Sequence, residues 1–116
     1  MGYKTIDIRK RPSRLTETIG VTRRGISFNR LIRQKTGMAR DSKVTFLVSE
    51  DGYIAFSVLP KESPTGGKLI RLTGSADTLM VLSTNLARHT TPGRYRITGR
   101  DGAFWLTDIK WEEEQQ

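Results

Sequence analysis

The sequence contains no cysteine, and this absence excludes several kinds of chemistry at once. Without cysteine the chain has no disulfide framework, no reactive thiolate and no cysteine-ligated zinc site. Its single histidine, His89, lies in a threonine-rich stretch with no second histidine and no carboxylate pair nearby. Neither a metal site nor a catalytic triad is expected around it.

Phosphate-binding loops and metal-binding carboxylate clusters are also missing from the sequence. The stretch Gly66-Gly67-Lys68 lacks the glycine spacing and the hydroxyl residue of a nucleotide-binding loop. Asp51 and Asp101 each precede a glycine in an expected hairpin turn, where aspartate is common for backbone reasons. We therefore expect no enzymatic activity and no cofactor.

The chain is also poor in apolar residues, which make up 35% of it, and its mean hydropathy is −0.48. No apolar run approaches the roughly 18 residues that a membrane-spanning helix needs. The start, MGYKTIDIRKRP, lacks the apolar core of a secretory signal. We expect a cytoplasmic protein, nucleoid-associated or in a host cytoplasm if viral, with one thin core that favours oligomerisation.

Positive charge is concentrated in the first third of the chain. Residues 1–43 hold 12 Lys/Arg against three acidic residues, whereas residues 44–116 hold eight against nine, and the whole chain carries +8. Such clustering is typical of proteins that neutralise the phosphates of a nucleic acid. Two alternatives remain open, namely an anionic membrane or protein partner and a solvated basic face that only aids solubility.

The stretch from Ile19 to Lys61 predicts a strand, a turn, a short helix and a hairpin. The strand is expected over 15–22, with Arg23-Arg24-Gly25 as the turn after it. A helix of about two turns should follow, capped by Ser27 or Asn29, with Leu31 and Ile32 inward and its end at Gly37. Strands are expected over 44–49 and 53–59, joined by Glu50-Asp51-Gly52.

This order of elements resembles the AbrB/SpoVT family of swapped-hairpin DNA-binding domains. The matching residues, which lie within about 40 of the 116, are Ile26-Ser27, Leu31-Ile32-Arg33, Thr36-Gly37 and Asp41-Ser42-Lys43-Val44. The chain has Arg24-Gly25 where the family usually has Gly-Arg, and Ser27 where the family usually has proline. The resemblance implies a prokaryotic or viral transcription regulator or DNA-coating protein that contacts duplex DNA through Arg23 or Arg24 and through Arg33.

A second, degenerate copy of this unit is expected later in the chain. Residues 82–91 can be laid over 27–36, which puts Leu86 on Leu31 and Arg88 on Arg33, and residues 94–110 can be laid over 44–60. One such unit cannot cover its own apolar face, so a second one is needed to close a small barrel. Coincidental likeness of two hairpins with similar turns is the alternative.

The predicted fold is mainly β with two short helices, a small β-barrel made of two fused strand–helix–hairpin units in an AbrB-like pseudo-dimer. The expected parts are an N-terminal strand and basic arm (1–18), a first unit (19–61), a linker (62–67), a second unit (68–111) and an acidic tail (112–116). Further strands are expected over 3–9, 68–73 and 78–82, and the three glutamates of the tail are expected to be frayed.

The second hairpin carries aromatic residues beside cations. Arg94, Arg96 and Thr98 are expected on one face of its first strand, with Tyr95 and Ile97 on the other. If Tyr95 or Trp105 were exposed, they would suit stacking on single-stranded bases. Burial in the core is the interpretation that we favour.

We therefore expect a nucleic-acid-binding protein that contacts phosphates through an Arg/Lys-rich face. The predicted contact residues are Arg9, Lys10, Arg11, Arg14, Arg23, Arg24, Arg30, Arg33, Lys35, Arg40 and Lys43. Duplex DNA is the favoured partner. Two alternatives stay open: single-stranded binding like that of Whirly-type or small viral coating proteins, and a structural subunit that pairs with copies of itself as a homo-oligomer.

Overall fold

The computed structural model describes residues 16–72, 74 and 77–113. Their strands are β1 (Ile19–Val21), β2 (Gly25–Phe28), β3 (Lys43–Val48), β4 (Tyr53–Leu59), β5 (Gly67–Lys68), β6 (Ile70–Arg71), β7 (Leu79–Leu82), β8 (Gly93–Tyr95), β9 (Ile97–Asp101) and β10 (Phe104–Lys110). The helices are α1 (Arg30–Thr36) and α2 (Thr84–Arg88). The prediction of a mainly β fold with two short helices is confirmed.

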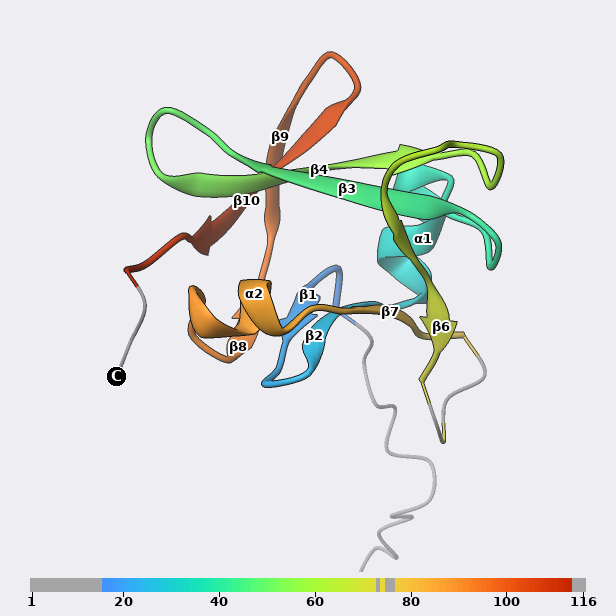
Figure 1. Ribbon diagram of the computed structural model, residues 1–116, viewed down its shortest axis with the longest axis horizontal. Coiled ribbons are helices and arrows are strands. Elements are labelled where there is room, and N and C mark those ends of the chain that lie inside the picture. The colour runs from blue at the N-terminus through green and yellow to red at the C-terminus, as the bar shows by residue number, and fades with distance from the viewer. Residues whose placement is uncertain (1–15, 73, 75–76, 114–116) are drawn as a thin grey trace, which may run out of the picture.

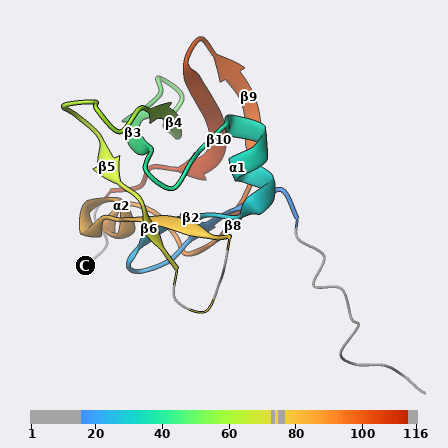
Figure 2. The same ribbon diagram turned by 90° about the vertical axis from the view of Figure 1, so that its right-hand side faces the viewer.

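Two antiparallel sheets face each other. Sheet A has the strand order β6-β7-β2-β1-β8, and sheet B has the order β5-β3-β4-β10-β9. Sheet B is the upper layer and sheet A the lower layer in Figure 1, and the quarter turn of Figure 2 shows α1 at the side of the two layers. The predicted strand, short helix and hairpin of the first unit are present as β1, α1, β3 and β4. The structure adds β2, a strand that was not predicted, between the basic turn and α1.

The chain passes from one sheet to the other at two places. Between β5 and β6 the single residue Leu69 separates a pair with β3 in sheet B from a pair with β7 in sheet A. Between β8 and β9, Arg96 separates a pair with β1 from a pair with β10. The predictions of one strand over 68–73 and one strand from Arg94 onward are therefore corrected, because each extended segment serves two sheets.

Strands in the same position of the two predicted units pair with each other. In sheet A, β2 lies antiparallel to β7, with Ile26 opposite Val81 and Phe28 opposite Leu79. In sheet B, β4 lies antiparallel to β10. The residues of the two units are thus hydrogen-bonded across the middle of both sheets.

Helix α1 begins and ends at residues with clear capping roles. The side chain of Asn29 accepts a hydrogen bond from the Ile32 amide at 3.1 Å and donates one to the Thr16 carbonyl at 2.7 Å. At the other end Gly37 has φ 77°, and its amide donates to the Arg33 carbonyl at 2.8 Å. Of the two expected N-caps, Asn29 is the one used.

Helix α2 repeats the N-cap contact of α1 but not its glycine C-cap, and it corrects the predicted alignment. Ser83 caps it through the Leu86 amide, as Asn29 does for Ile32. Thr90 donates its hydroxyl proton to the Leu86 carbonyl, and Thr36 makes the same contact with Ile32. Leu86 therefore corresponds to Ile32 rather than to Leu31, so the predicted helix register was wrong by one residue.

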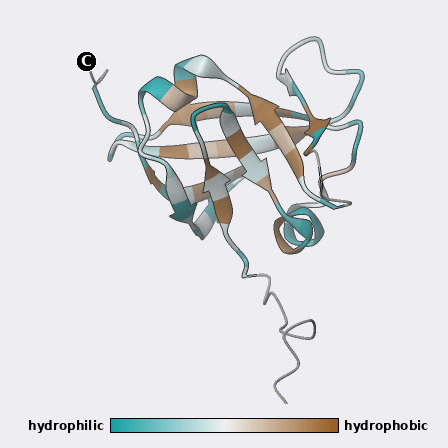
Figure 3. Ribbon diagram, turned by 90° about the horizontal axis from the view of Figure 1, so that it is seen from below, coloured by the Kyte–Doolittle hydropathy of each residue, from teal (hydrophilic) through white to brown (hydrophobic). Residues whose placement is uncertain are grey.

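The core lies between the sheets and takes side chains from both. The Phe28 ring of sheet A and the Phe56 ring of sheet B have centroids 5.2 Å apart. Ile32 and Leu86 add one buried side chain from each helix, whereas Leu31 is only half-buried. Figure 3 shows apolar and polar segments alternating along the strands, as expected for sheets with one covered face.

Both ends of the described chain differ from expectation. The strand predicted over 15–22 is ordered as a strand only over Ile19–Val21, and the strand over 3–9 and the arm residues lie outside the described residues. At the other end, the Glu112 amide donates to the His89 carbonyl at 2.6 Å, and its carboxylate accepts from Thr91. The first glutamate of the tail is thus held in place. In the described part of the chain, neither helix has the length and apolar character needed to cross a membrane.

Substitution of Gly25 tests the close approach of β2 to β7. A Cβ atom on Gly25 would lie 1.9 Å from the Val81 carbonyl oxygen, and the residue has φ 154°. We expect Gly25→Ala to lower the free energy of unfolding by ~3 kcal/mol or more, measured by urea titration. Gly37→Ala is the control, because nothing lies within 4 Å of its added Cβ and only the positive φ is strained, which costs ~1 kcal/mol. Equal losses in both variants would contradict the tight pairing.

Candidate nucleic-acid interface

The turn between β1 and β2 presents two exposed arginines, Arg23 and Arg24. The turn is fixed by backbone and hydroxyl contacts: the Thr22 amide donates to the Gly25 carbonyl at 2.9 Å, and the Arg24 amide donates to Thr22 Oγ1 at 3.2 Å. Within the part of the chain that the structure describes, neither guanidinium makes a hydrogen bond or an ion pair. Two free guanidinium groups therefore extend from a rigid turn.

Helix α2 lies directly beside this turn. The Ser83 amide donates to the Arg24 carbonyl at 2.9 Å, which ties the start of the helix to the turn. A shallow hollow of about 420 Å³ is lined by Arg23, Thr84, Ala87 and Arg88, and no carboxylate lines it. We call Arg23, Arg24, Thr84 and Arg88 the turn–helix surface. Its charge comes from both halves of the chain.

Helix α1 does not offer the same free charge. Arg30 is exposed, but Arg33 is half-buried and donates from Nη1 to the Asp77 carbonyl at 2.8 Å. The Nε atom of Arg33 is buried without a partner. Arg33 therefore links α1 to the segment before β7. The family resemblance implies that this arginine contacts DNA, but its guanidinium is engaged in a hydrogen bond within the protein.

A third group of cations lies around the start of β3, together with acidic side chains. Arg40, Lys43, Lys61 and Lys68 line a hollow of about 490 Å³ together with Asp41 and Glu62. Lys43 donates from Nζ to the Ser63 carbonyl at 2.5 Å. The carboxylates and this hydrogen bond reduce the positive potential that the group can offer to a polyanion.

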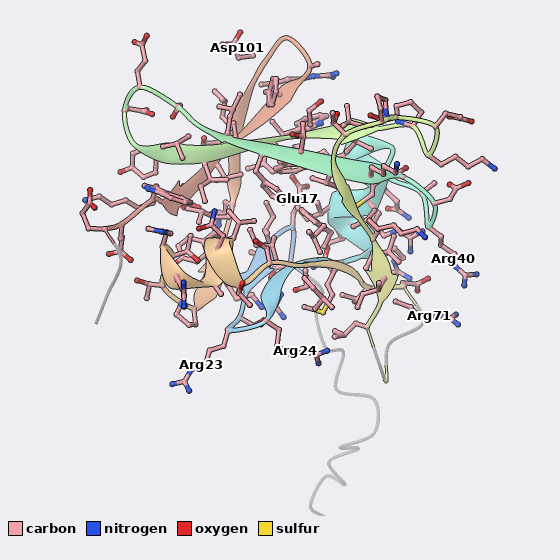
Figure 4. The ribbon with its side chains drawn as sticks, in the orientation of Figure 1. Glu17, Arg23, Arg24, Arg40, Arg71 and Asp101 are labelled. Atoms are coloured by element: carbon pink, nitrogen blue, oxygen red, sulfur yellow. The ribbon has the colours of Figure 1, made fainter. Side chains whose placement is uncertain are left out.

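The predicted contact residues are thus separated in space rather than gathered. In Figure 4, Arg23 and Arg24 point away from the lower sheet, whereas Arg40 lies at a different side of the molecule. Lys35 forms an ion pair with Glu17 at 2.8 Å. The predicted arm residues, Arg9, Lys10, Arg11 and Arg14, lie outside the described residues. Among the described ones, Arg23 and Arg24 form a pair on one exposed turn.

The aromatic residues of the second hairpin pack against the core. Tyr95 and Trp105 are half-buried against it, while Arg94 and Arg96 are exposed, so the predicted separation of faces along this strand is confirmed. The Arg100 guanidinium lies 4.5 Å from the centre of the Trp105 ring. One face of that ring is therefore already covered by a cation.

Arg88 and Thr84 are the surface residues that sequence reasoning missed as contact candidates. They join the turn only because β7 pairs with β2, which brings the start of α2 against Arg24. No local pattern in the sequence marks this contact, since some 60 residues separate the two segments. If the two predicted units are aligned by their N-cap residues, Asn29 and Ser83, Leu86 falls on Ile32 and α2 is in the observed register.

The phenol of Tyr95 lies in a setting that favours its neutral form. Burial, followed by the negative charges of Glu112 and Asp108, raises the pKa of Tyr95 above its usual value of 10.0. Its hydroxyl donates to the Thr91 carbonyl at 2.5 Å. The Tyr95 hydroxyl is thus a hydrogen-bond donor that links β8 to the segment after α2.

No protein-family model matches the chain, and no curated protein or solved structure matches it significantly. Among the described residues, no group of three or more His, Asp or Glu side chains is placed to hold a metal ion. The geometry and charge of the surfaces are therefore the observations that bear on function.

Titration of Tyr95 provides a test of its surroundings. Because the folded state raises the pKa, the stability that the Tyr95 proton contributes is fully present below about pH 10, the value of an unfolded tyrosine, and is lost as pH rises toward the folded pKa. Phenolate absorbance of the wild type should show a late phase above that pH which Tyr95→Phe removes. A Tyr95→Phe variant that loses an early phase instead would contradict the assignment.

Proposed function

We propose that the protein binds nucleic acid, duplex DNA foremost, through the turn–helix surface. The observation that supports this most is the pair of exposed guanidinium groups on Arg23 and Arg24, held on a hydrogen-bonded turn with no carboxylate beside them. Arginine presents five N–H donors in a flat fork that matches phosphate oxygens and the guanine edge. A rigid turn reduces the entropy that is lost when such groups are ordered on a ligand.

The charge distribution along the chain supports the same partner. Residues 1–43 carry a net charge of +9, and the remaining 73 residues carry −1. Each phosphate that is neutralised releases condensed counterions, so a cluster of this size favours a polyanion. The arm cations Arg9, Lys10, Arg11 and Arg14 precede β1, the strand that leads into the turn, and their charge adds to the attraction between the chain and a polyanion.

At the level of the fold, we propose that the chain is two AbrB-like units fused into one small barrel. The matching N-caps of α1 and α2 support this, as do the β2–β7 and β4–β10 pairs, which a two-fold axis between the units would produce. The passage of the chain between the sheets at Leu69 and at Arg96 would close the barrel at both sides. A prokaryotic or viral regulator or DNA-coating protein of the cytoplasm fits such a design.

The two halves of this arrangement differ in charge, and we propose that one half makes the main contact. The turn beside α2 carries Arg23 and Arg24, whereas the segment beside α1 carries Asp77 and holds Arg33 by its carbonyl. A duplicated scaffold with one basic end favours binding to a single site rather than to a palindrome. Its footprint on DNA should be correspondingly short and without symmetry.

Single-stranded nucleic acid is the second candidate, and the Arg100–Trp105 pair favours it. An aromatic ring with a cation at 4.5 Å is a common platform for base stacking. Half-burial of Trp105 weighs against this use. A comparison of matched single- and double-stranded oligonucleotides separates the two candidates.

The decisive variant is Arg23→Ala/Arg24→Ala, tested by fluorescence anisotropy with a labelled duplex across a salt series. Each lost phosphate contact should reduce the slope of log K against log salt by ~0.9, so the double variant should lose up to ~2. If the turn also reads bases, preference among duplex sequences should fall as well.

The matched control is Lys61→Ala/Lys110→Ala, which removes the same charge from two exposed residues elsewhere. An equal change of slope in both double variants would show that net charge alone drives binding and would contradict a turn-centred interface. Tighter binding of the single strand at every salt concentration would select the second candidate.

A further inference from the structure

Sheet B carries a groove on the face that points away from the core. The groove has a volume of about 920 Å³ and lies between the β3–β4 and β9–β10 hairpins. Strand register places Leu47 opposite Ala55, Ala55 opposite Leu106, and Leu106 opposite Gly99, so one row crosses four strands. Because Phe46 and Phe56 point to the core, this alternate row points outward. The groove therefore has an apolar floor.

Parts of this floor are open to solvent. Leu47 and Tyr53 are exposed to 39% and 38%, and both belong to the small set of large apolar side chains that the described residues leave exposed. Phe104 and Leu106 are half-buried in the same groove. Exposed apolar side chains that converge in a concave surface are typical of a docking site for another segment.

The rim of the groove is acidic. Glu50, Asp51, Asp101 and Asp108 line it, and no lysine or arginine does. These are four of the chain's 12 carboxylates, in a protein whose net charge is +8. Within the described chain none of the four forms an ion pair. Figure 4 places Asp101 at the far side of the molecule from Arg23 and Arg24, so the groove is remote from the turn–helix surface.

We propose that this groove docks an extended basic segment, and that the occupant is the stretch Lys4–Arg14 of this chain itself. Its sequence, KTIDIRKRPSR, has Ile6 and Ile8 two residues apart, five cations and one acidic residue. An extended chain turns such alternate residues to the same side, where the apolar floor would cover them. The cations that follow would then meet the carboxylates of the rim.

Three physical features make this segment the fitting occupant. Proline lacks a backbone N–H and disfavours a helical conformation of the residue before it, so Pro12 favours an extended segment over a helix. The excess of four positive charges in the segment complements the four carboxylates of the rim. Ile6 precedes Thr16 by ten residues, which can span up to ~35 Å when extended, enough for Ile6 and Ile8 to leave sheet A and reach a neighbouring surface. Docking between copies would be head-to-tail, because arm and groove are different surfaces.

Disulfide cross-linking tests the docking on the full chain, since no native cysteine interferes. In the variant Thr5→Cys/Asp101→Cys one cysteine lies in the segment and one in the groove. Under mild oxidation we expect it to cross-link about tenfold faster than Thr5→Cys/Glu62→Cys, whose second cysteine is equally exposed but outside the groove. On a non-reducing gel, a cross-linked monomer of altered mobility shows docking within one copy, and a dimer band shows docking between copies.

A second pair of changes separates docking from chance collision. Adding Leu47→Lys and Glu50→Lys to the Thr5→Cys/Asp101→Cys chain should slow cross-linking to the rate of the Glu62→Cys control, because both the floor and the rim are altered. Adding Glu62→Lys instead should leave the rate unchanged. Equal rates for Asp101→Cys and Glu62→Cys, or a rate insensitive to Leu47→Lys/Glu50→Lys, would overturn the proposal. The measurement contains no nucleic acid, so its failure would leave the proposed function standing.

Discussion

The structure depends on the close contact between β2 and β7, where the backbone of Gly25 lies against the carbonyl of Val81. A side chain at this position would overlap that carbonyl, since a Cβ would lie 1.9 Å from its oxygen. The contact joins the first and second halves of the chain in sheet A and, one residue further, allows the Ser83 amide to bond to the Arg24 carbonyl. The β2–β7 contact therefore fixes both the packing of the two halves and the position of the basic turn.

The same scaffold places an arginine pair and a group of carboxylates on opposite sides of the molecule. Turns at the end of sheet A carry Arg23 and Arg24, and hairpin turns at the end of sheet B carry Asp51 and Asp101. Turn residues tolerate substitution better than strand residues because their side chains are solvated. A protein with this polarity presents one side to a polyanion and repels it from the other, which would orient it on the ligand.

Local signals in the sequence were sufficient for the first hairpin and for the end of α1. Glu50-Asp51-Gly52 predicts the first hairpin because glycine adopts the positive φ of 88° there, and Gly37 predicts the end of α1 for the same reason. The sequence did not predict which strands pair, because the pairing of β2 with β7 joins residues that lie far apart in the chain. The register of α2 was missed by one residue because matching leucine to leucine ignored the caps that fix each helix.

The candidate surface was predictable only in part, for a related reason. Charge density along the chain located Arg23 and Arg24 correctly on an exposed turn, but it could not show that Arg33 is held by a backbone carbonyl or that Lys35 pairs with Glu17. The central claim is that one end of this polar molecule faces nucleic acid. Amide chemical shifts of the labelled protein, followed by NMR during titration with a short duplex, test it most directly. Shifts centred on Thr22–Gly25 and Thr84–Arg88, with the residues around Asp51 and Asp101 unmoved, are predicted, and shifts centred on those hairpin turns would contradict the account.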